Sequence, residues 1–141
     1  MSNAPVAAVI GHPVNHSRSP RMHNYWLAQF GLEGYYIPLD IDPKKFETSI
    51  RNLPELGFVG ANITIPYKEK VLKIADKISD RAALVGAANT LTFLQNGGIY
   101  ADNTDGYGFL QNIKSKYKDW SAREGISVVF GAGGASRAIL G

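Results

Sequence analysis

Cysteine is absent from this chain of 141 residues. The absence excludes disulfides and thiolate metal sites, and it is typical of proteins that work in a reducing compartment. Long apolar runs are also missing, because none approaches the roughly 20 residues that span a bilayer. The N-terminus lacks the basic segment and apolar stretch of a secretory signal peptide. These absences predict a cytoplasmic protein with no membrane partner.

A strong excess of charge of one sign is lacking as well. The formal net charge is +3, with 15 Lys and Arg against 12 Asp and Glu. Binding of nucleic acid would need a clustered basic stripe with aromatic platforms, so we expect no nucleic-acid partner. Pro13 lies between His12 and His16 and argues against the helix that would align their imidazoles as metal ligands. We expect His23 on the outer face of its helix, and no metal site.

The sequence does contain a regular alternation of apolar segments and helical patterns. Short apolar runs predict strands at residues 6–10, 35–39, 58–65, 91–94 and 99–102. The last two flank Asn96-Gly97-Gly98, which is typical of a hairpin turn. Strands that alternate with helices indicate the α/β class, with an open, mostly parallel twisted sheet flanked by helices. The hairpin adds antiparallel pairing near one edge.

Helices are predicted between these strands. In the first, Ser19 is expected to be the N-cap, with Pro20 at the first helical position and Gly31 closing the helix. Helical spacing places its apolar side chains on one face: Met22, Tyr25, Trp26 and Phe30. A second helix follows Asp42-Pro43, with Phe46, Ile50 and Leu53 inward. The others are expected over residues 71–78 and 79–85 and from about Gly106 onward, the last with a stripe of Tyr107, Leu110, Ile113 and Tyr117.

The last residues have the pattern of a nucleotide-binding turn. Residues 126–130 are predicted to be a short buried strand, and a glycine-rich turn and the start of a helix follow. Such a turn offers free backbone N–H groups and a positive helix end to a pyrophosphate. Gly131 and Gly133 fit Gly-x-Gly-x-x-Gly, whereas Ser136 fills the third position. The candidate cofactor-binding residues are Gly131, Ala132, Gly133, Gly134 and Ala135. The alternative is a flexible tail that contains glycines.

A polar segment at residues 116–125 separates two regions. We predict a substrate-binding and catalytic domain at residues 1–118. The junction and the beginning of a dinucleotide-binding domain are expected at residues 119–141. The acidic residue that grips a ribose hydroxyl, about 20 residues after such a turn, would fall beyond Gly141. The residues that distinguish one dinucleotide from another would also lie there.

Polar side chains gather at the strand ends, where open α/β sheets bind ligands. Hydroxyls, amides, one ammonium and one carboxylate suit a small, hydroxyl-rich ligand with one acid–base pair. In chain order these residues are Ser17, Ser19, Asn62, Thr64, Lys68, Asn89, Thr90, Asn103, Thr104 and Asp105.

Each of these residues also has a purely structural explanation. Ser19 and Asp105 could serve only as helix caps, Thr64 as an ordinary strand residue and Asn89 as a turn residue. Lys68 could belong to a solvated helix start, although a lysine in the first turn opposes the helix dipole. Because all of them fall at strand ends, a shared site is the favoured interpretation.

Six segments match, in order and approximate spacing, the motifs of one enzyme family. They are Gly11-His12-Pro13-Val14, His16-Ser17-Arg18-Ser19-Pro20-Arg21-Met22-His23-Asn24, Gly60-Ala61-Asn62-Ile63-Thr64-Ile65-Pro66-Tyr67-Lys68, Gly86-Ala87-Ala88-Asn89-Thr90-Leu91, Asp102-Asn103-Thr104-Asp105-Gly106 and Gly131-Ala132-Gly133-Gly134-Ala135. On these motifs the chain resembles the shikimate dehydrogenase family over nearly its whole length. The resemblance implies NADP-dependent interconversion of 3-dehydroshikimate and shikimate in aromatic amino-acid biosynthesis. Members of this family are about twice as long, so this piece alone is expected to be inactive.

The resemblance also implies roles for individual residues. Ser17 and Ser19 would hold the substrate carboxylate, and Lys68 would be the acid–base group beside Asp105. Ring hydroxyls would be bound by Thr64, Asn89 and Asp105. The pyrophosphate of NADP would lie at residues 131–135. Two weaker transfers are Asp80, near the cofactor, and Asn62, as a supporting residue of the site.

Two other functions stay open. One is a quinate or quinate/shikimate dehydrogenase that uses NAD, although Ser17 and Ser19 together favour shikimate. The other is a non-catalytic ligand sensor. The presence of both Lys68 and Asp105 argues against a sensor, which has no need of an acid–base pair. A homodimer is the assembly that we consider.

Overall fold

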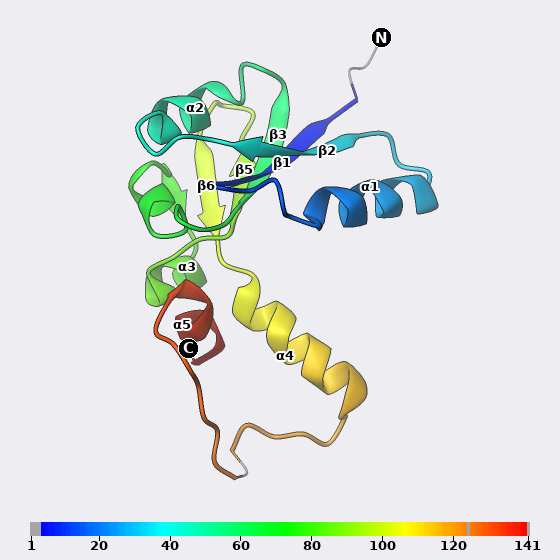
Figure 1. Ribbon diagram of the computed structural model, residues 1–141, viewed down its shortest axis with the longest axis vertical. Helices are drawn as coiled ribbons and strands as arrows, with labels where there is room; N and C mark the ends of the chain where they lie inside the picture. The colour runs from blue at the N-terminus through cyan, green and yellow to red at the C-terminus, as the bar shows by residue number, and fades with distance from the viewer. Residues whose placement is uncertain (1–3, 124, 141) are drawn as a thin grey trace.

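A six-stranded sheet organises the larger part of the molecule (Figure 1). The computed structural model describes residues 4–123 and 125–140, so the outer limits of both predicted domains, at residues 1 and 141, lie outside the described residues. The strand order is β2-β1-β3-β5-β6-β4. The strands are β1 (Val6–Gly11), β2 (Tyr35–Asp40), β3 (Phe58–Ile63), β4 (Lys77–Ile78), β5 (Thr90–Phe93) and β6 (Ile99–Asp102).

The sheet is mixed in direction. β1 lies between β2 and β3 and runs parallel to both. β5 runs antiparallel to β3 and to β6, and β4 pairs with β6 in parallel at the edge. Three of the five strand pairs are therefore parallel. The predicted α/β class, the mostly parallel sheet and the hairpin are confirmed.

The direction of β5 decides which residues meet at one end of the sheet. Asn62, near the end of β3, is paired with Thr90 at the start of β5, and Thr90 is paired with Asp102 at the end of β6. On the other side, Ile10 near the end of β1 is paired with Ile63. The segments that follow β1, β3 and β6 therefore leave the sheet at the same end as the segment that enters β5.

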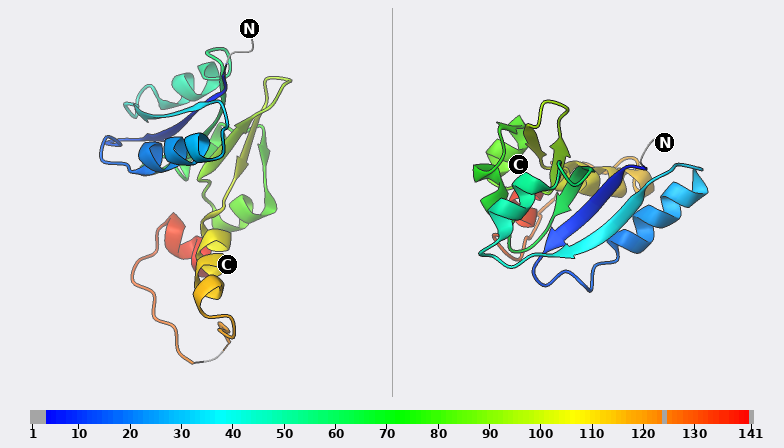
Figure 2. Two further views of the ribbon diagram at one scale, coloured as in Figure 1. Left: turned by 90° about the vertical axis from the view of Figure 1, so that its right-hand side faces the viewer. Right: turned by 90° about the horizontal axis from the view of Figure 1, so that it is seen from above.

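Helices cover both faces of the sheet, and two more lie beyond its end. They are α1 (Ser19–Gln29), α2 (Phe46–Asn52), the 3-10 helix η1 (Lys70–Lys73), α3 (Asp80–Val85), α4 (Asp105–Lys116) and α5 (Gly134–Leu140). Side chains alternate along β1, as expected of a strand. Ala8 and Ile10 belong to the core cluster that includes residues of α2 and η1, while Val9 packs with Tyr36 on the other face. α4 leads away from the sheet and packs against α5 (Figure 2).

The larger core lies between the sheet and the α2–η1 layer. Phe46 and Tyr67 stack there with ring centroids 3.9 Å apart. Tyr67 is completely buried, and its hydroxyl donates a hydrogen bond to the carbonyl of Ile41. The inward positions predicted for Phe46, Ile50 and Leu53 are confirmed. Because Tyr67 directly precedes Lys68, this buried ring anchors the segment that carries the ammonium.

The predictions for α1 are wrong in its cap and its inner face. The helix includes Ser19, and its N-cap is Arg18, which makes no side-chain cap hydrogen bond. His23, expected on the outer face, instead stacks on Tyr36. The side chain of Asn24 binds both the N–H and the C=O of Tyr36, at 3.0 and 2.8 Å, which fixes the rotation of the helix. That rotation leaves the predicted apolar face exposed: Met22, Tyr25, Trp26 and Phe30.

The helix predicted over residues 71–78 is also wrong. Only Lys70–Lys73 are helical, and Lys77–Ile78 form β4. The N–H of Asp76 donates to Ile99 and that of Ser79 donates to Ala101, so pairing with β6 displaces the helix. The next predicted helix is confirmed as α3, and Ser79 is its N-cap. β3 ends two residues earlier than expected, and α2 begins later, at Phe46.

The strand predicted over residues 126–130 is wrong as well. These residues have no regular structure, and Ile126 and Phe130 are 96% and 94% exposed. An apolar run becomes a strand only when a neighbour takes up its N–H and C=O groups. None of the described residues supplies such a neighbour here. The helix expected after the glycines is confirmed as α5, and the long helix near Gly106 as α4. Within the described ranges, every helix is too short or too polar to cross a membrane.

Candidate active site

A polar pocket of about 310 Å³ opens at the end of the sheet where the strand segments converge. Seven of the polar residues that the sequence singled out line it: Ser17, Ser19, Asn62, Thr64, Lys68, Asn89 and Asp105. Its other lining residues are Val9, Val14, His16, His23 and Ile63. Segments far apart in the chain therefore share one cavity, because they leave the sheet at the same end.

Lys68 and Asp105 form the one close ion pair in this pocket among the described residues. The Nζ of Lys68 donates to Oδ2 of Asp105 at 2.6 Å. Lys68 follows β3 and the buried Tyr67, while Asp105 is the first residue of α4. The two side chains are 21% and 27% exposed, so the pair is sheltered and still reached by solvent.

Asn89 holds Asp105 from its other side. The amide nitrogen of Asn89 donates to Oδ1 of Asp105 at 2.7 Å and to Oγ1 of Thr104 at 3.0 Å. The amide oxygen of Asn89 accepts from the hydroxyl of Thr90 and from the N–H of Thr104. With both ends of its amide occupied, Asn89 has a fixed orientation. Each carboxylate oxygen of Asp105 therefore has its own donor.

Asn103 is buried outside the pocket lining and supports this arrangement. It is 3% exposed, and its amide nitrogen donates to the carbonyl of Ala87 at 2.8 Å. Its amide oxygen accepts from the N–H of Asp105 at 3.0 Å. The sequence predicts Asn103 among the ligand-facing residues, but the structure places it outside the pocket lining, where it fixes the backbone at Asp105.

The loop that carries the two serines is tied to the end of β2. The Nδ1 of His12 lies 2.6 Å from Oδ1 of Asp40, and the N–H of Val14 donates to the other oxygen at 3.1 Å. Hydrogen bonding to His12, then to Val14, holds the pKa of Asp40 below its ordinary value. The N–H of Ser19 donates to Oγ of Ser17 at 3.3 Å, which brings the two hydroxyls together. The loop thus presents both to the pocket.

Sequence reasoning missed a second hydrogen-bonded group at the pocket wall. The hydroxyl of Tyr36 donates to Oδ1 of Asn62 at 2.6 Å, and the nitrogen of Asn62 donates to Asn89 at its carbonyl and to Oγ1 of Thr90. His23 stacks on Tyr36 with ring centroids 4.1 Å apart. Burial lowers the pKa of His23 and raises that of Tyr36 to about 12. The only signal in the sequence was that Tyr36 lies in a strand and His23 in the preceding helix.

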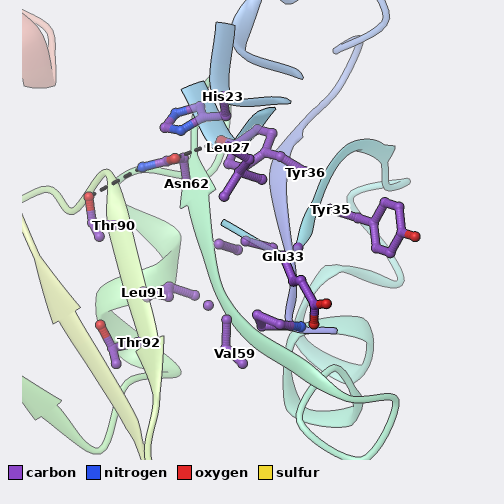
Figure 3. Close-up of a pocket in the computed structure, with 15 residues that line it drawn as sticks. His23, Leu27, Glu33, Tyr35, Tyr36, Val59, Asn62, Thr90, Leu91 and Thr92 are labelled. Atoms are coloured by element: carbon purple, nitrogen blue, oxygen red, sulfur yellow. Dashed lines mark hydrogen bonds between the residues drawn. The ribbon is translucent and has the colours of Figure 1, made fainter. Parts of the chain in front are cut away.

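A second cavity, of about 380 Å³, lies on the far side of this wall (Figure 3). Its lining is mostly apolar and includes Leu27, Val59 and Leu91, and it shares His23 and Asn62 with the polar pocket. Figure 3 shows the side chain of Asn62 between Tyr36 and Thr90. Lys68 and Asp105 do not line it. The ion pair therefore belongs to the polar pocket and not to this second cavity.

The glycine-rich turn borders a third cavity, of about 330 Å³. Lys68, Thr64 and Glu69 line it on one side, and Gly133, Gly134 and Ala135 line it on the other. Gly131 has φ of 114°, a conformation that favours glycine, and a Cβ on Gly133 would meet nothing within 4 Å. These features fit a phosphate-bearing cofactor that approaches the turn. Lys68 faces both this cavity and the polar pocket.

Asp80 does not line the cavity beside the glycine-rich turn, and its own cavity shares no lining residue with that one. It lines a separate cavity with Lys77, Ser79, Arg81 and Tyr100, while Gly131 and Ala132 line none of the three described above. In residues 4–123 and 125–140, no group of three or more His, Asp or Glu side chains could hold a metal ion.

The fold and the site define an α/β domain with a polar pocket and a lysine–aspartate ion pair at the sheet end. Residues 9–91 match the family described as the shikimate dehydrogenase substrate binding domain. The chain is 53% identical over 140 residues to the shikimate dehydrogenase (NADP(+)) of Roseobacter denitrificans, covering 99% of this chain and 50% of that one. It is 56% identical over 136 residues to that of a Jannaschia species, covering 96% and 49%.

A solved structure agrees with these relatives. The shikimate dehydrogenase of Thermus thermophilus in complex with NADP(H) and shikimate has a TM-score of 0.87 and 38% identity, covering 96% of this chain and 50% of that chain. The chain belongs to the shikimate dehydrogenase family. It spans about half the length of the curated relatives that it matches.

Proposed function

We propose that the full-length protein catalyses the NADP-dependent, reversible reduction of 3-dehydroshikimate to shikimate. The observation that carries the proposal is the contact of 2.6 Å between Lys68 and Asp105 in the polar pocket. Lys68 also lines the cavity that borders the glycine-rich turn. Besides a hydride donor, reduction of a ring ketone needs a proton donor and a pocket that binds the ring hydroxyls. The names of the relatives support the choice of substrate and cofactor.

Lys68 is the proposed acid–base group. Reduction leaves negative charge on the former ketone oxygen, which needs a proton donor within hydrogen-bond reach. The ammonium of Lys68 supplies this proton, and in the reverse direction its neutral amine accepts the proton of the substrate hydroxyl. Asp105 directs the amine, because its carboxylate is itself held by Asn89. NADP(H), when bound, supplies or accepts the hydride.

The remaining pocket residues are proposed to bind and orient the substrate. The paired hydroxyls of Ser17 and Ser19 would donate to its carboxylate. Thr64, Asn89 and Asp105 would bind the ring hydroxyls. In the proposed cofactor site the backbone of residues 131–135 would hold the pyrophosphate, supported by the cavity between this turn and Lys68. Asp80 is the weakest assignment, because it lines a different cavity.

The proposed domain division puts residues 1–118 in the substrate domain and residues 119–141 at the start of the cofactor domain. The packing of α4 against α5 supports α4 as the element that connects the two. A cytoplasmic location and a homodimer stay predictions. Sedimentation of the full-length protein tests the homodimer, and cell fractionation tests the location.

The proposed function is tested by assaying the full-length protein with four substrate pairs, namely shikimate or quinate with NADP or NAD. We expect the highest kcat/KM with shikimate and NADP. Preference for quinate and NAD would show the alternative dehydrogenase. Binding of shikimate with no turnover under any condition would show a ligand sensor.

A further inference from the structure

Arg137 joins α5 to two segments of the substrate-binding region. Its Nε donates to the carbonyl of Val85, the last residue of α3, at 2.9 Å. Its Nη2 donates to Oε1 of Glu69 at 2.6 Å. Glu69 directly follows Lys68. One guanidinium therefore links the helix after the glycine-rich turn to the segment that carries the proposed acid–base group.

Gly106 makes a second contact with α5. A Cβ on Gly106 would overlap the carbonyl oxygen of Ala138 and would lie 3.0 Å from its carbonyl carbon. The backbones of α4 and α5 therefore approach more closely here than any residue with a side chain permits. Because Gly106 directly follows Asp105, the close approach lies next to the second member of the ion pair.

Gly134 makes the third contact, from the glycine-rich turn itself. A Cβ on Gly134 would lie 3.0 Å from Cβ of Ala87 and 3.9 Å from Cδ of Lys68. Ala87 is completely buried and clusters with Val85 and Ala138. Its carbonyl accepts the hydrogen bond from Asn103 that supports Asp105. The turn therefore rests on the same framework that holds the ion pair.

We propose that Gly106 and Arg137 are positioning residues that form a seat for α5 and so fix the glycine-rich turn relative to Lys68 and Asp105. The proposal rests on the proposed function, because it assigns the seat to the geometry of hydride transfer. Arg137 and Glu69 are 42% and 63% exposed, and exposed ion pairs are individually weak. The backbone contact at Gly106 is therefore the larger determinant.

The first test is Gly106→Ala in the full-length protein, with Gly108→Ala as the matched control. Gly108 lies in the same helix, and a Cβ there would meet nothing within 4 Å. We expect Gly106→Ala to lower kcat by about 10²-fold, since a misplacement of about 1 Å can cost that much. NADP should bind more weakly by calorimetry, while the Kd for shikimate stays within about twofold because the pocket side chains are unchanged. Gly108→Ala should leave all three quantities unchanged.

Arg137→Gln and Arg137→Lys form the second test, which stands even if Gly106→Ala fails to fold. Glutamine cannot pair with Glu69 as a charge, whereas lysine can reach one of the two acceptors. We expect Arg137→Gln to weaken NADP binding several-fold without changing the Kd for shikimate, and Arg137→Lys to recover part of the loss. A purely structural role would lower thermal stability without separating the two ligands.

A third measurement needs neither ligand. Ala87→Cys with Gly134→Cys should form a disulfide under mild oxidation, because the two Cβ atoms would lie 3.0 Å apart and a movement of about 0.5 Å brings them into the range of about 3.5–4.5 Å that disulfides require. Ala87→Cys with Gly108→Cys should not. The proposed seat for α5 would be refuted by absence of the first cross-link. It would also be refuted if Gly106→Ala and Gly108→Ala had equal NADP affinity and equal kcat. A wild-type protein without turnover would instead overturn the proposed function. Even then, absence of the cross-link would overturn the proposed packing of α5 against residue 87.

Discussion

At the scale of single residues, the ammonium of Lys68 is oriented by its contacts rather than by deep burial. One carboxylate oxygen of Asp105 receives Lys68 and the other receives Asn89. The pair keeps partial access to solvent, with 21% and 27% exposure. In its proposed role as the acid–base group, Lys68 can regain its proton from water after each turnover, because Asp105 directs it and solvent still reaches it.

Replacing Lys68 by alanine should reduce turnover far more than affinity. General acid–base catalysis contributes about 10²- to 10⁴-fold, so kcat of the full-length protein should fall by that factor. The Kd for shikimate should change little, because the hydroxyl-binding side chains remain. Steady-state kinetics and calorimetry measure the two quantities, and Lys70→Ala, two positions away, is the control. A large loss of affinity with turnover intact would contradict the assigned role.

Removing the hydroxyl of Tyr36 should loosen the wall of the pocket. Burial raises the pKa of Tyr36 to about 12, so the phenol stays protonated and remains a donor to Asn62 at alkaline as well as neutral pH. Tyr36→Phe keeps the ring stacked on His23 and should lower the free energy of unfolding by about 1 kcal/mol. Urea denaturation measures the change. Tyr35→Phe is the control, because Tyr35 is 63% exposed, and an equal loss there would contradict the explanation.

The sequence could predict which polar residues lie in one pocket, but not which hydrogen bonds they form with one another. The rule that ligands bind at strand ends selected Thr64, Lys68 and Asp105, which the structure places in one pocket. The contact between Tyr36 and Asn62 depends on how α1 and β2 are rotated. That rotation is set by the two hydrogen bonds of Asn24, which no periodicity reveals.

At the scale of elements, the N-terminus of α3 is tied to the end of β6. The Oγ of Ser79 accepts from the N–H of Ala82 and donates to Oδ1 of Asp102 at 2.6 Å. Burial by itself raises the pKa of Asp102, but hydrogen bonds from Ser79, Arg81 and the N–H of Asn103 together lower it below its ordinary value. Its contribution to stability is therefore complete above the ordinary pKa of 3.8 and is lost as pH falls through the lower folded value.

Ser79→Ala should destabilise the protein by about 1 kcal/mol at neutral pH, through the lost cap. The mutation also removes a bond that lowers the pKa of Asp102, so the difference from wild type should shrink at about pH 3. Urea denaturation at the two pH values measures both effects. Ser115→Ala, on the exposed side of α4, is the control. A difference that grows in acid would refute the coupling of Ser79 to Asp102.

Elements were predicted well where local pattern and tertiary pairing agree. The strands β1, β2, β5 and β6 and the short helix α3 follow from local signals alone. Residues 71–78 have helical spacing, yet backbone pairing with β6 extends Lys77 and Ile78. The apolar run at residues 126–130 stays irregular because no described strand lies beside it. In both cases the outcome depends on a partner that is distant in sequence.

At the scale of the whole molecule, residues of this chain line the polar pocket that we propose binds shikimate, so shikimate should stabilise the chain. A ligand that binds only the folded state adds about 2.7 kcal/mol at 100 times its Kd. We expect the thermal midpoint to rise with shikimate concentration. The double variant Ser17→Ala with Ser19→Ala should lose most of the rise, because the carboxylate contacts are gone. An equal rise in the double variant would argue against those contacts.

The order of the strands was the part of the architecture that the sequence could not supply. Alternating strands and helices indicated a parallel sheet, but the position of β5 beside β3 is a long-range choice. That position matters for function, because it brings Asn89 to the end of the sheet where Lys68 lies.

The hairpin turn at residues 95–98 lies at the other end of β5 and β6, separated from the pocket by the length of these four-residue strands, or about 13 Å. Gly97 has φ of 82°, and the N–H of Gly98 bonds to Asn96, so the turn closes on itself. A peptide tag or a fluorophore inserted there would leave the ligand entrance open. This turn is therefore a suitable anchor for immobilising the protein on a sensor surface.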